Sequence, residues 1–346
     1  SDAKFFWDKD RSKNLIKQIA NLKAVTFYEK LGTIYDKTQR IRQLAALLSD
    51  DLNINKEKVQ IAASISKADL CSDLVGEYPE LQGVMGKYFA LSQGFEEDVA
   101  NAVSDHYLPI GISSPVPKKP VSFSISIIDK VDSLTGFFLI DEKPTSSKDP
   151  FALRRAAIGL LRIIIENNLN IKLREIISYS IRLFEDQGIK IENSNAEIDI
   201  LNFLKERMRN ILKEKKIQND IIEASISSHI GDNYLDLYKK NILMNKYINK
   251  EIGKNAINSY KRAFNIIEKT GKGITGRPDA VLFRKEEEKQ LFEKITNILK
   301  DLTVKEDKKN YEKLLIQLSE TKPFTDNFFE NVQVNDENHD IKNNRL

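Results

Sequence analysis

The spacing of the apolar residues constrains the fold of this chain more than any other feature. Apolar side chains recur at positions i, i+3, i+4 and i+7 through most of the sequence, as in segments 15–25, 38–48 and 59–74, each of which is expected to form one helix. This period places them on one face of an α-helix, whereas a half-buried strand would alternate apolar and polar residues. The 346 residues include only 14 Gly and 9 Pro, too few for the many turns of a sandwich or barrel. The sequence therefore predicts an all-α protein built from helical bundles.

Loop-like segments interrupt this pattern at three places. Residues 109–120 and 141–149 are rich in Pro, Ser and charged side chains, and the glycines of 270–280 do not follow the order of a phosphate-binding loop. Because 346 residues exceed the usual size of one domain, we expect two or three units with boundaries near these loops. Asp149 is expected to cap the helix that follows it, with Pro150 at the first helical position.

The composition excludes several classes of protein. The chain has 54 Lys and Arg against 51 Asp and Glu, so it is no polycation, although its mildly basic second half permits contact with a polyanion. The single cysteine, Cys71, cannot form an internal disulfide and indicates a reducing compartment. No apolar run approaches the roughly 20 residues of a membrane span, and the charged start does not resemble a signal peptide. We therefore expect a cytoplasmic protein that makes no membrane contact.

Basic residues gather in two places near the middle of the chain. Lys148, Arg154 and Arg155 surround a predicted helix start, and both helix N-termini and Arg side chains bind phosphates well. Arginines in this position also commonly pair with carboxylates on a neighbouring element. Arg209 and Lys213 lie on one face of a predicted helix, which is equally typical of a solvated helix surface.

An aromatic residue joins a basic pair further along the chain. Tyr260 precedes Lys261 and Arg262, and this mixture is used to bind single-stranded RNA loops. The alternative is an ordinary amphipathic helix in which Phe264 and Ile267 belong to the core.

No set of residues predicts a catalytic centre. The three histidines, His106, His229 and His339, lie far apart in the sequence, and no arrangement of Ser, Cys, His and Asp suggests a nucleophile. Asp129 and Asp132 are polar positions in an otherwise apolar helix, where they could bind a metal, hold a lysine or face solvent. We predict no catalytic residues and no bound metal.

Several long strings resemble one protein family. They are VTFYEKLGTIYDKTQRI, SKADLCSDLVGEYPELQGVMGKYFA, IIDKVDSLTGFF, KPTSSKDPFALRRAAIGLLRIIIE and PFTDNFFENVQVNDENHDIKNNRL. These strings closely resemble the beta subunit of the bacterial heterotetrameric glycyl-tRNA synthetase, and together they extend over nearly the whole chain. Members of this family are longer, so the resemblance implies a carboxy-terminal portion of such a subunit.

The resemblance implies a plan of domains. Residues 1–19 would be the tail end of a preceding region, and residues 20–165 an HD-like helical domain with a degenerate metal site. Residues 166–230 would be a helical linker, and residues 231–346 a helical anticodon-binding domain of the DALR type.

The resemblance also implies a function. The chain would be the tRNA-binding part of the glycine–tRNA ligase beta subunit and would recognise glycine tRNA for aminoacylation by the alpha subunit, in an assembly of two alpha and two beta chains. ATP and Mg²⁺ would act at the alpha subunit, so this chain would need no cofactor. Under this interpretation the basic and aromatic side chains become tRNA-binding candidates: Lys148, Arg154, Arg155, Arg209, Lys213, Tyr260, Lys261, Arg262 and Arg345.

The metal site of HD phosphohydrolases is altered in this sequence. Alignment with the HD pattern places Ser66 and Lys67 where the metal-binding His and Asp would stand, and Asp129 at the later acidic position. The ammonium of Lys67 is therefore expected to replace the metal and neutralise Asp129, unless Lys67 is a surface residue. Two other functions stay open: an active HD-type metal-dependent phosphohydrolase, and a structural scaffold for the alpha subunit without RNA contact.

Overall fold

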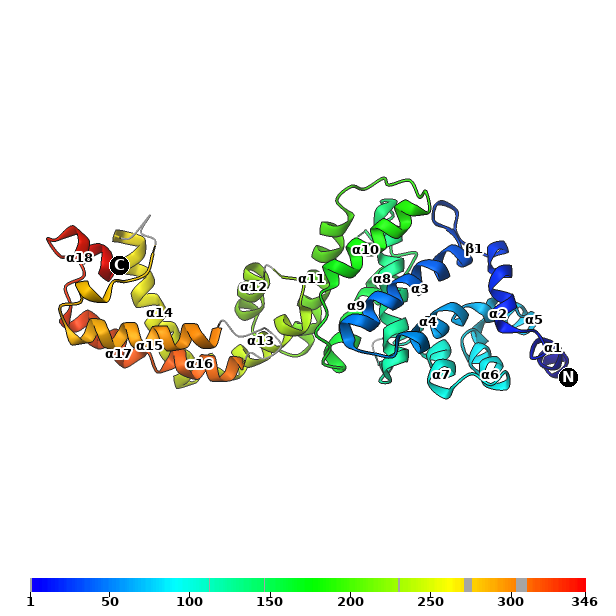
Figure 1. Cartoon of the computed structure of the whole chain (residues 1–346), viewed down its shortest axis with the longest axis horizontal. Helices are drawn as coiled ribbons and strands as arrows, with labels where there is room; N and C mark the ends of the chain where they lie inside the picture. Colours follow the sequence, from blue (N-terminus) through cyan, green and yellow to red (C-terminus); the bar gives the residue numbers. More distant parts are fainter. Residues whose placement is uncertain (1, 112, 146, 230, 271–275, 303–309) are drawn as a thin grey trace. The chain divides into compact units, whose positions relative to one another are not determined.

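The computed structural model describes residues 2–111, 113–145, 147–229, 231–270, 276–302 and 310–346. Helices make up most of this part of the chain, which confirms the all-α prediction (Figure 1). Its strands are β1 (Thr26–Tyr28) and β2 (Gly32–Thr33), which form one antiparallel pair. These strands are too short to show a clear alternation, so the sequence pattern did not predict them.

Contacts within the chain divide it into two compact units. Unit 1 comprises residues 1–215 and 226–238, and unit 2 comprises residues 216–225 and 239–346. The boundaries expected near residues 19, 165 and 230 remain predictions.

The helices of unit 1 are α1 (Asp2–Asp10), α2 (Leu15–Gln18), α3 (Ile34–Leu52), α4 (Lys56–Ile65), α5 (Asp73–Glu77), α6 (Val84–Ser92), α7 (Glu97–Asp105), α8 (Pro120–Leu139), α9 (Leu153–Glu166), α10 (Leu173–Asp186) and α11 (Ala196–Glu214). Helices α12 (Asn219–Ser228) and α13 (Tyr234–Tyr247) contribute residues to both units. Unit 2 also contains α14 (Glu251–Thr270), α15 (Glu286–Leu302), α16 (Tyr311–Ser319), α17 (Lys322–Asn331) and α18 (His339–Arg345). Short 3₁₀ turns occur at Ile19–Ala24, Glu29–Leu31, Ala68–Cys71, Pro79–Leu81 and Ala280–Leu282.

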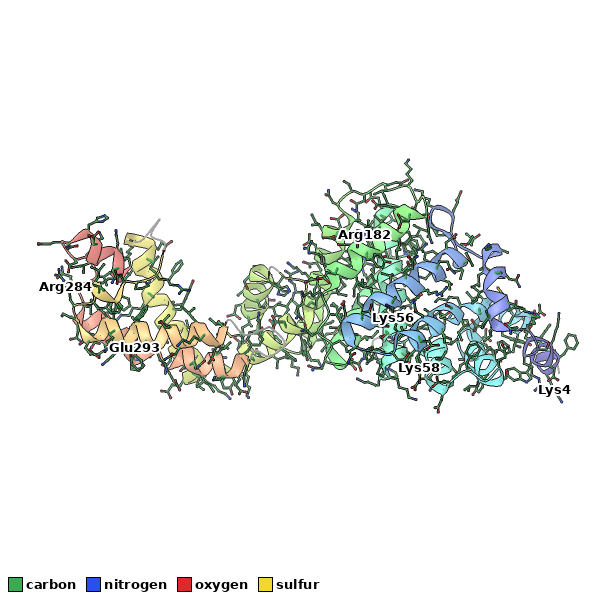
Figure 2. The ribbon with its side chains drawn as sticks, in the orientation of Figure 1. Lys4, Lys56, Lys58, Arg182, Arg284 and Glu293 are labelled. Atoms are coloured by element: carbon green, nitrogen blue, oxygen red, sulfur yellow. The ribbon has the colours of Figure 1, made fainter. Side chains whose placement is uncertain are left out.

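Helix α8 forms the centre of unit 1. Nearly all of its residues are buried, and these include charged side chains such as Lys130 and Asp132 as well as the apolar ones. It packs against α3, α7, α9, α10 and α11 (Figure 1). Gly136 allows one of these close approaches, because a Cβ there would lie 2.8 Å from the ring of Phe184 on α10. Charged side chains of the surrounding helices, such as Lys56 and Arg182, lie at the surface (Figure 2).

The helix expected over residues 59–74 is interrupted. Helix α4 ends at Ile65, and the chain continues as a 3₁₀ turn and the separate helix α5. Asp69 is fully buried in this turn, and its Oδ2 accepts hydrogen bonds from the backbone N–H groups of Gly83 at 2.6 Å and Gly86 at 3.0 Å. These long-range bonds stabilise the turn in place of a continuous helix, so the prediction of one helix was wrong.

Helix α9 begins later than its sequence suggests. Asp149 caps it as expected, since the two carboxylate oxygens accept hydrogen bonds from the N–H groups of Leu153 at 2.8 Å and Arg154 at 3.0 Å. Pro150, however, lies outside the helix, which starts only after Ala152, a residue in the left-handed conformation with φ of 54°. The position predicted for Pro150 was therefore wrong.

The first residues of the chain pack onto unit 1. Trp7 of α1 stacks on Phe89 of α6, with ring centroids 5.3 Å apart. Asp10 is buried, and its Oδ2 accepts a hydrogen bond of 2.8 Å from the N–H of Leu74 at the start of α5. Segment 2–19 thus contributes to the same core as the helices that follow it.

The loop expected over residues 270–280 lies partly outside the described residues, because 271–275 are not described. The residues that follow include the turn Ala280–Leu282, which precedes α15.

Candidate nucleic-acid interface

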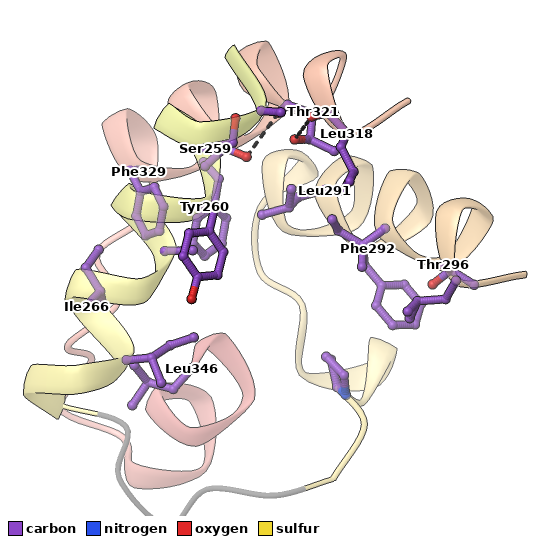
Figure 3. Close-up of a pocket in the computed structure, with 18 of the residues that line it drawn as sticks. Ser259, Tyr260, Ile266, Leu291, Phe292, Thr296, Leu318, Thr321, Phe329 and Leu346 are labelled. Carbon is purple, nitrogen blue, oxygen red and sulfur yellow. Dashed lines mark hydrogen bonds between the residues drawn. The ribbon is translucent and has the colours of Figure 1, made fainter. Parts of the chain in front are cut away.

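Unit 2 contains a large apolar cavity. Its volume is about 990 Å³, and its walls come from α13, α14, α15, α16, α17 and the end of the chain. Figure 3 shows Tyr260 of α14, Phe292 of α15 and Leu346 around it. An apolar cavity at the surface is suited to the faces of planar ligands, including nucleobases.

Tyr260 and Phe264 form an exposed aromatic pair beside this cavity. Tyr260 is 66% exposed and Phe264 is 45% exposed, and their rings stack with centroids 5.6 Å apart. Ile267 is likewise 45% exposed, so the alternative that placed Phe264 and Ile267 in the core was wrong. Burial of such rings against an unstacked base would remove apolar surface from water and add stacking energy.

The two basic neighbours of Tyr260 have different environments. Lys261 is exposed, and within the described part of the chain no ion pair involves it. Arg262 is half-buried, forms an ion pair of 2.7 Å with Asp326 of α17 and lies over the ring of Phe329. Lys261 is therefore accessible to a phosphate, whereas Arg262 joins α14 to α17.

Arg345 is the least accessible of the tRNA-binding candidates. Its side chain is 5% exposed, with Nε 2.7 Å from Glu288 and Nη1 2.8 Å from Asp336. The hydrogen bond to Glu288 outweighs the effect of burial and raises the pKa of Arg345. This guanidinium connects α18 to α15, so we do not propose it as an RNA contact.

The basic candidates of unit 1 fall into two groups. Lys148 and Arg155 are exposed and Arg154 is half-buried, all at the start of α9, where Asp149 already accepts from the helix N–H groups. A phosphate at this helix would therefore meet the basic side chains rather than the backbone. On α11, Arg209 pairs with Glu206, while Lys213 is exposed.

Unit 1 also contains a buried network of charges, which the sequence predicted only in part. Lys67 Nζ lies 3.2 Å from Asp129 Oδ1, so the expected ion pair is present. Lys37 Nζ lies 3.4 Å from the same oxygen and 3.0 Å from Asp132 Oδ2, and Arg40 Nε lies 2.7 Å from Asp132 Oδ1. Lys67 is 5% exposed and Asp132 is 0% exposed, which excludes a surface position for either of them.

The cations of this network determine how its carboxylates titrate. Burial acts to raise the pKa of Asp129, but Lys37 and Lys67 outweigh it and hold that pKa below its ordinary value. For Asp132, burial is likewise outweighed by Arg40 and Lys37, which lower its pKa. Both carboxylates therefore remain charged inside the unit.

A histidine that the sequence pattern did not single out lies beside the network. His106 is fully buried, its Nδ1 lies 2.7 Å from the carbonyl oxygen of Val103, and its Nε2 has no hydrogen-bond partner in the described residues. Burial, and then the charge of Lys67, lower the pKa of His106 well below its ordinary value. The sequence around His106 has no pattern that would predict a buried histidine beside a charge network.

The metal interpretation fits these side chains poorly. Ser66 is buried and donates a hydrogen bond from Oγ to the carbonyl oxygen of Ala63, while Lys67 brings a positive charge to Asp129. Within the described ranges, no group of three or more His, Cys, Asp or Glu side chains could hold a metal ion. An ammonium next to the carboxylate would also repel a cation.

Comparison with known proteins identifies the kind of domain that unit 2 contains. Residues 256–346, which form most of it, match the DALR anticodon binding domain family. Residues 1–227 match the glycyl-tRNA synthetase beta subunit family. The chain therefore belongs to the glycyl-tRNA synthetase beta subunit family, as the resemblance implied.

Individual relatives agree with this assignment. The whole chain is 38% identical to the glycine–tRNA ligase beta subunit of Rickettsia felis over 347 residues, covering 49% of that protein. It is 39% identical to the corresponding subunit of Rickettsia canadensis over 346 residues, covering 50% of it. For the subunit of Rhodospirillum centenum the identity is 37% over 357 residues, covering 49% of it. The chain thus spans about half the length of the curated relatives it matches.

Among the described residues, no helix is both long enough and apolar enough to cross a lipid bilayer.

Proposed function

We propose that this chain is the tRNA-binding part of a glycine–tRNA ligase beta subunit and that unit 2 holds the anticodon loop of glycine tRNA. The observation that carries the proposal is the exposed stack of Tyr260 and Phe264 beside the apolar cavity, in the region that matches an anticodon-binding domain. Splayed bases would stack on the aromatic pair, and Lys261 would meet a phosphate.

The proposal assigns the chemistry of aminoacylation to another chain. ATP, Mg²⁺ and glycine would be bound by an alpha subunit in the cytoplasm, in an assembly of two alpha and two beta chains, and the beta chain would deliver the tRNA. The absence of a recognisable catalytic arrangement in the sequence supports this division. The metal-dependent phosphohydrolase alternative lacks support, because Lys67 pairs with the carboxylate that such chemistry needs.

A binding experiment tests the RNA assignment. The full chain is titrated with the fluorescent anticodon stem-loop of glycine tRNA, and Tyr260→Ala is expected to weaken binding by about 1–3 kcal/mol, because one base can no longer stack. Tyr88→Ala is the control, because Tyr88 is a tyrosine of unit 1 that is 52% exposed. Equal affinities of the two variants would contradict the role of Tyr260, and the scaffold function would then be favoured.

An activity measurement tests whether the catalytic site lies in another chain. The purified chain, free of alpha subunit, is expected to show no glycine-dependent ATP–pyrophosphate exchange. Exchange above the background of a protein-free sample would contradict the proposal that the catalytic site lies elsewhere.

A further inference from the structure

Three lysines of unit 2 gather where α13 ends and α14 begins. Lys246 and Lys250 both lie over the ring of Tyr247, with their Nζ atoms 4.8 Å and 5.3 Å from its centroid. Gly253 allows this close turn, because a Cβ at that position would collide with the carbonyl oxygen of Tyr247. The junction of the two helices therefore brings two ammonium groups to one aromatic ring.

Lys254 continues this group on the next turn. Its N–H donates a hydrogen bond of 3.0 Å to the carbonyl oxygen of Lys250, so the two residues are one helical turn apart. A rise of about 1.5 Å per residue separates them by about 6 Å along the helix. Both side chains are exposed, and in the part of the chain that the structure describes neither of them forms an ion pair. We call Lys246, Lys250 and Lys254 the lysine junction.

Carboxylates near the lysine junction do not cancel its charge. Residues 239–254 contain five lysines and one acidic residue, Glu251. Lys246 Nζ lies 3.0 Å from Glu312 Oε1 on α16, which also accepts a hydrogen bond from the hydroxyl of Tyr247. The Lys246 side chain is 54% exposed, and an exposed ion pair contributes at most about 1 kcal/mol, so a phosphate can replace the carboxylate.

The lysine junction adjoins the apolar cavity. Met244, Ile248 and Gly253 all line the cavity, and each lies within two residues of one of the three lysines. An RNA loop whose bases enter the cavity would therefore carry its backbone past these side chains. Lysine ammonium groups carry donors alone and bind phosphate as point charges, which positions a backbone without reading its sequence.

We propose that the lysine junction binds backbone phosphates of the anticodon stem, next to the loop whose bases enter the cavity. The inference rests on the proposed function, since it takes the RNA held at the cavity to be the anticodon arm of glycine tRNA. It adds three residues outside the candidates named from the sequence, and a part of the RNA that the aromatic pair does not contact. Backbone contacts of this kind make binding depend on salt, because each neutralised phosphate releases counterions.

The test compares two RNAs on the full chain over a range of salt concentrations. They are the anticodon stem-loop of glycine tRNA and its loop alone as a single-stranded oligonucleotide. Lys250→Gln combined with Lys254→Gln is expected to weaken binding of the stem-loop about tenfold or more at low salt. The slope of log affinity against log salt should fall by about 1.4–1.8, which is about 0.7–0.9 for each of two phosphates. For the loop alone, the slope should fall by less than the amount that corresponds to one phosphate.

Matched variants separate the position of a charge from its presence. Arg284→Gln combined with Lys289→Gln removes two exposed basic side chains of the same unit and should leave both slopes close to those of the unsubstituted chain. Figure 2 labels Arg284, which lies at the end of unit 2 away from α13. Lys250→Arg combined with Lys254→Arg keeps both charges and should keep the stem-loop slope. Thermal melting of the Gln variant should not change, because neither lysine forms an ion pair in the described structure.

Several outcomes would overturn the proposal. One is a stem-loop slope for the double Gln variant of the junction equal to that of the Arg284 and Lys289 control. Another is an equal decrease of slope for both RNAs. Loss of alpha-subunit binding with both slopes unchanged would mean that the lysine junction binds an acidic protein surface instead.

The proposed function fails separately. If Tyr260→Ala leaves binding of both RNAs unchanged while the lysine variant lowers the stem-loop slope, the anticodon-loop assignment is wrong and the phosphate site stands. If Tyr260→Ala weakens binding of both RNAs while the lysine variant changes neither slope, only the lysine junction is wrong.

Discussion

The two units differ in where their charged and apolar side chains lie. Unit 1 buries a network of ions around α8, with Arg40 and Asp132 both fully buried. Unit 2 exposes apolar side chains around its cavity, including Tyr260 at 66% and Leu299 at 53%. It buries the pair of Arg345 and Glu288, but its pair of Arg262 and Asp326 is partly exposed. In unit 1 the buried ion pairs join α3 to α8, whereas the apolar side chains exposed in unit 2 do little for its stability and are available to a ligand. A binding surface is therefore better sought where apolar side chains remain exposed.

The largest effect is expected at the centre of unit 1. Asp132→Ala leaves Arg40 buried without its carboxylate partner, which should lower the free energy of unfolding by about 3–5 kcal/mol. Urea unfolding followed by circular dichroism measures the change. Asp50→Ala is the control, since Asp50 forms an exposed ion pair with Lys56, and it should cost at most about 1 kcal/mol. Similar costs for the two variants would contradict the importance of the buried network.

A smaller effect is expected for Lys67 and Asp129, because Lys37 also lies near Asp129. Lys67→Met should destabilise unit 1, by less than Asp132→Ala does, and adding Asp129→Asn should recover part of the stability, with a coupling of about 0.5–3 kcal/mol. Thermal melts of both single variants and the double variant measure the coupling. Strictly additive shifts would show that the pair contributes nothing. One divalent metal bound per unmutated chain would contradict the replacement of a metal by Lys67.

The next effect is a dependence of stability on pH. The pKa of His106 is lowered in the folded chain, so below about pH 6.5 the unfolded chain binds a proton that the folded chain excludes. Stability should therefore be complete above that pH and fall as pH decreases, by at most about 1.4 kcal/mol per pH unit. His106→Asn should flatten this decline in urea titrations between pH 7 and 5. An unchanged slope in the variant would assign the decline to other groups.

The smallest effect separates the two basic neighbours in unit 2. Arg262→Gln breaks the partly exposed ion pair with Asp326 and should lower the stability of unit 2 by up to about 1 kcal/mol. Lys261→Gln should not change stability but should lower the salt slope of stem-loop binding by the amount that corresponds to one phosphate. Differential scanning fluorimetry and a salt titration measure the two quantities. Equal shifts in melting temperature for Arg262→Gln and Lys261→Gln would contradict the different environments assigned to these two residues.

Local patterns in the sequence predicted much of the helical structure. The apolar period predicted most of the helices, but it did not show that α8, with its polar and charged positions, is buried on nearly every side. The capping role of Asp149 was also readable, because its partners lie four and five residues away. The break after Ile65 was not, since the bonds of Asp69 reach residues 14 and 17 positions further on.

The candidate site was likewise predictable from the sequence only in part. The sequence named Tyr260, Lys261 and Arg262 as one group, but the structure separates an accessible lysine from an arginine engaged by Asp326. Arg345 was assigned to RNA because it lies in the region that resembles the anticodon domain, yet two carboxylates surround it. Only the structure shows that the rings of Tyr260 and Phe264 stack and that both are exposed on α14.

The sequence by itself determined the helical class, the family and the types of charge available to each unit. The tertiary structure decided which of those charges meet. Lys37 and Arg40 reach Asp132 across more than ninety positions of the chain. Periodicity reports the face of a helix on which a residue lies, because it arises from backbone geometry within a few turns. It carries no information about the partner on another helix, which depends on how the cores pack.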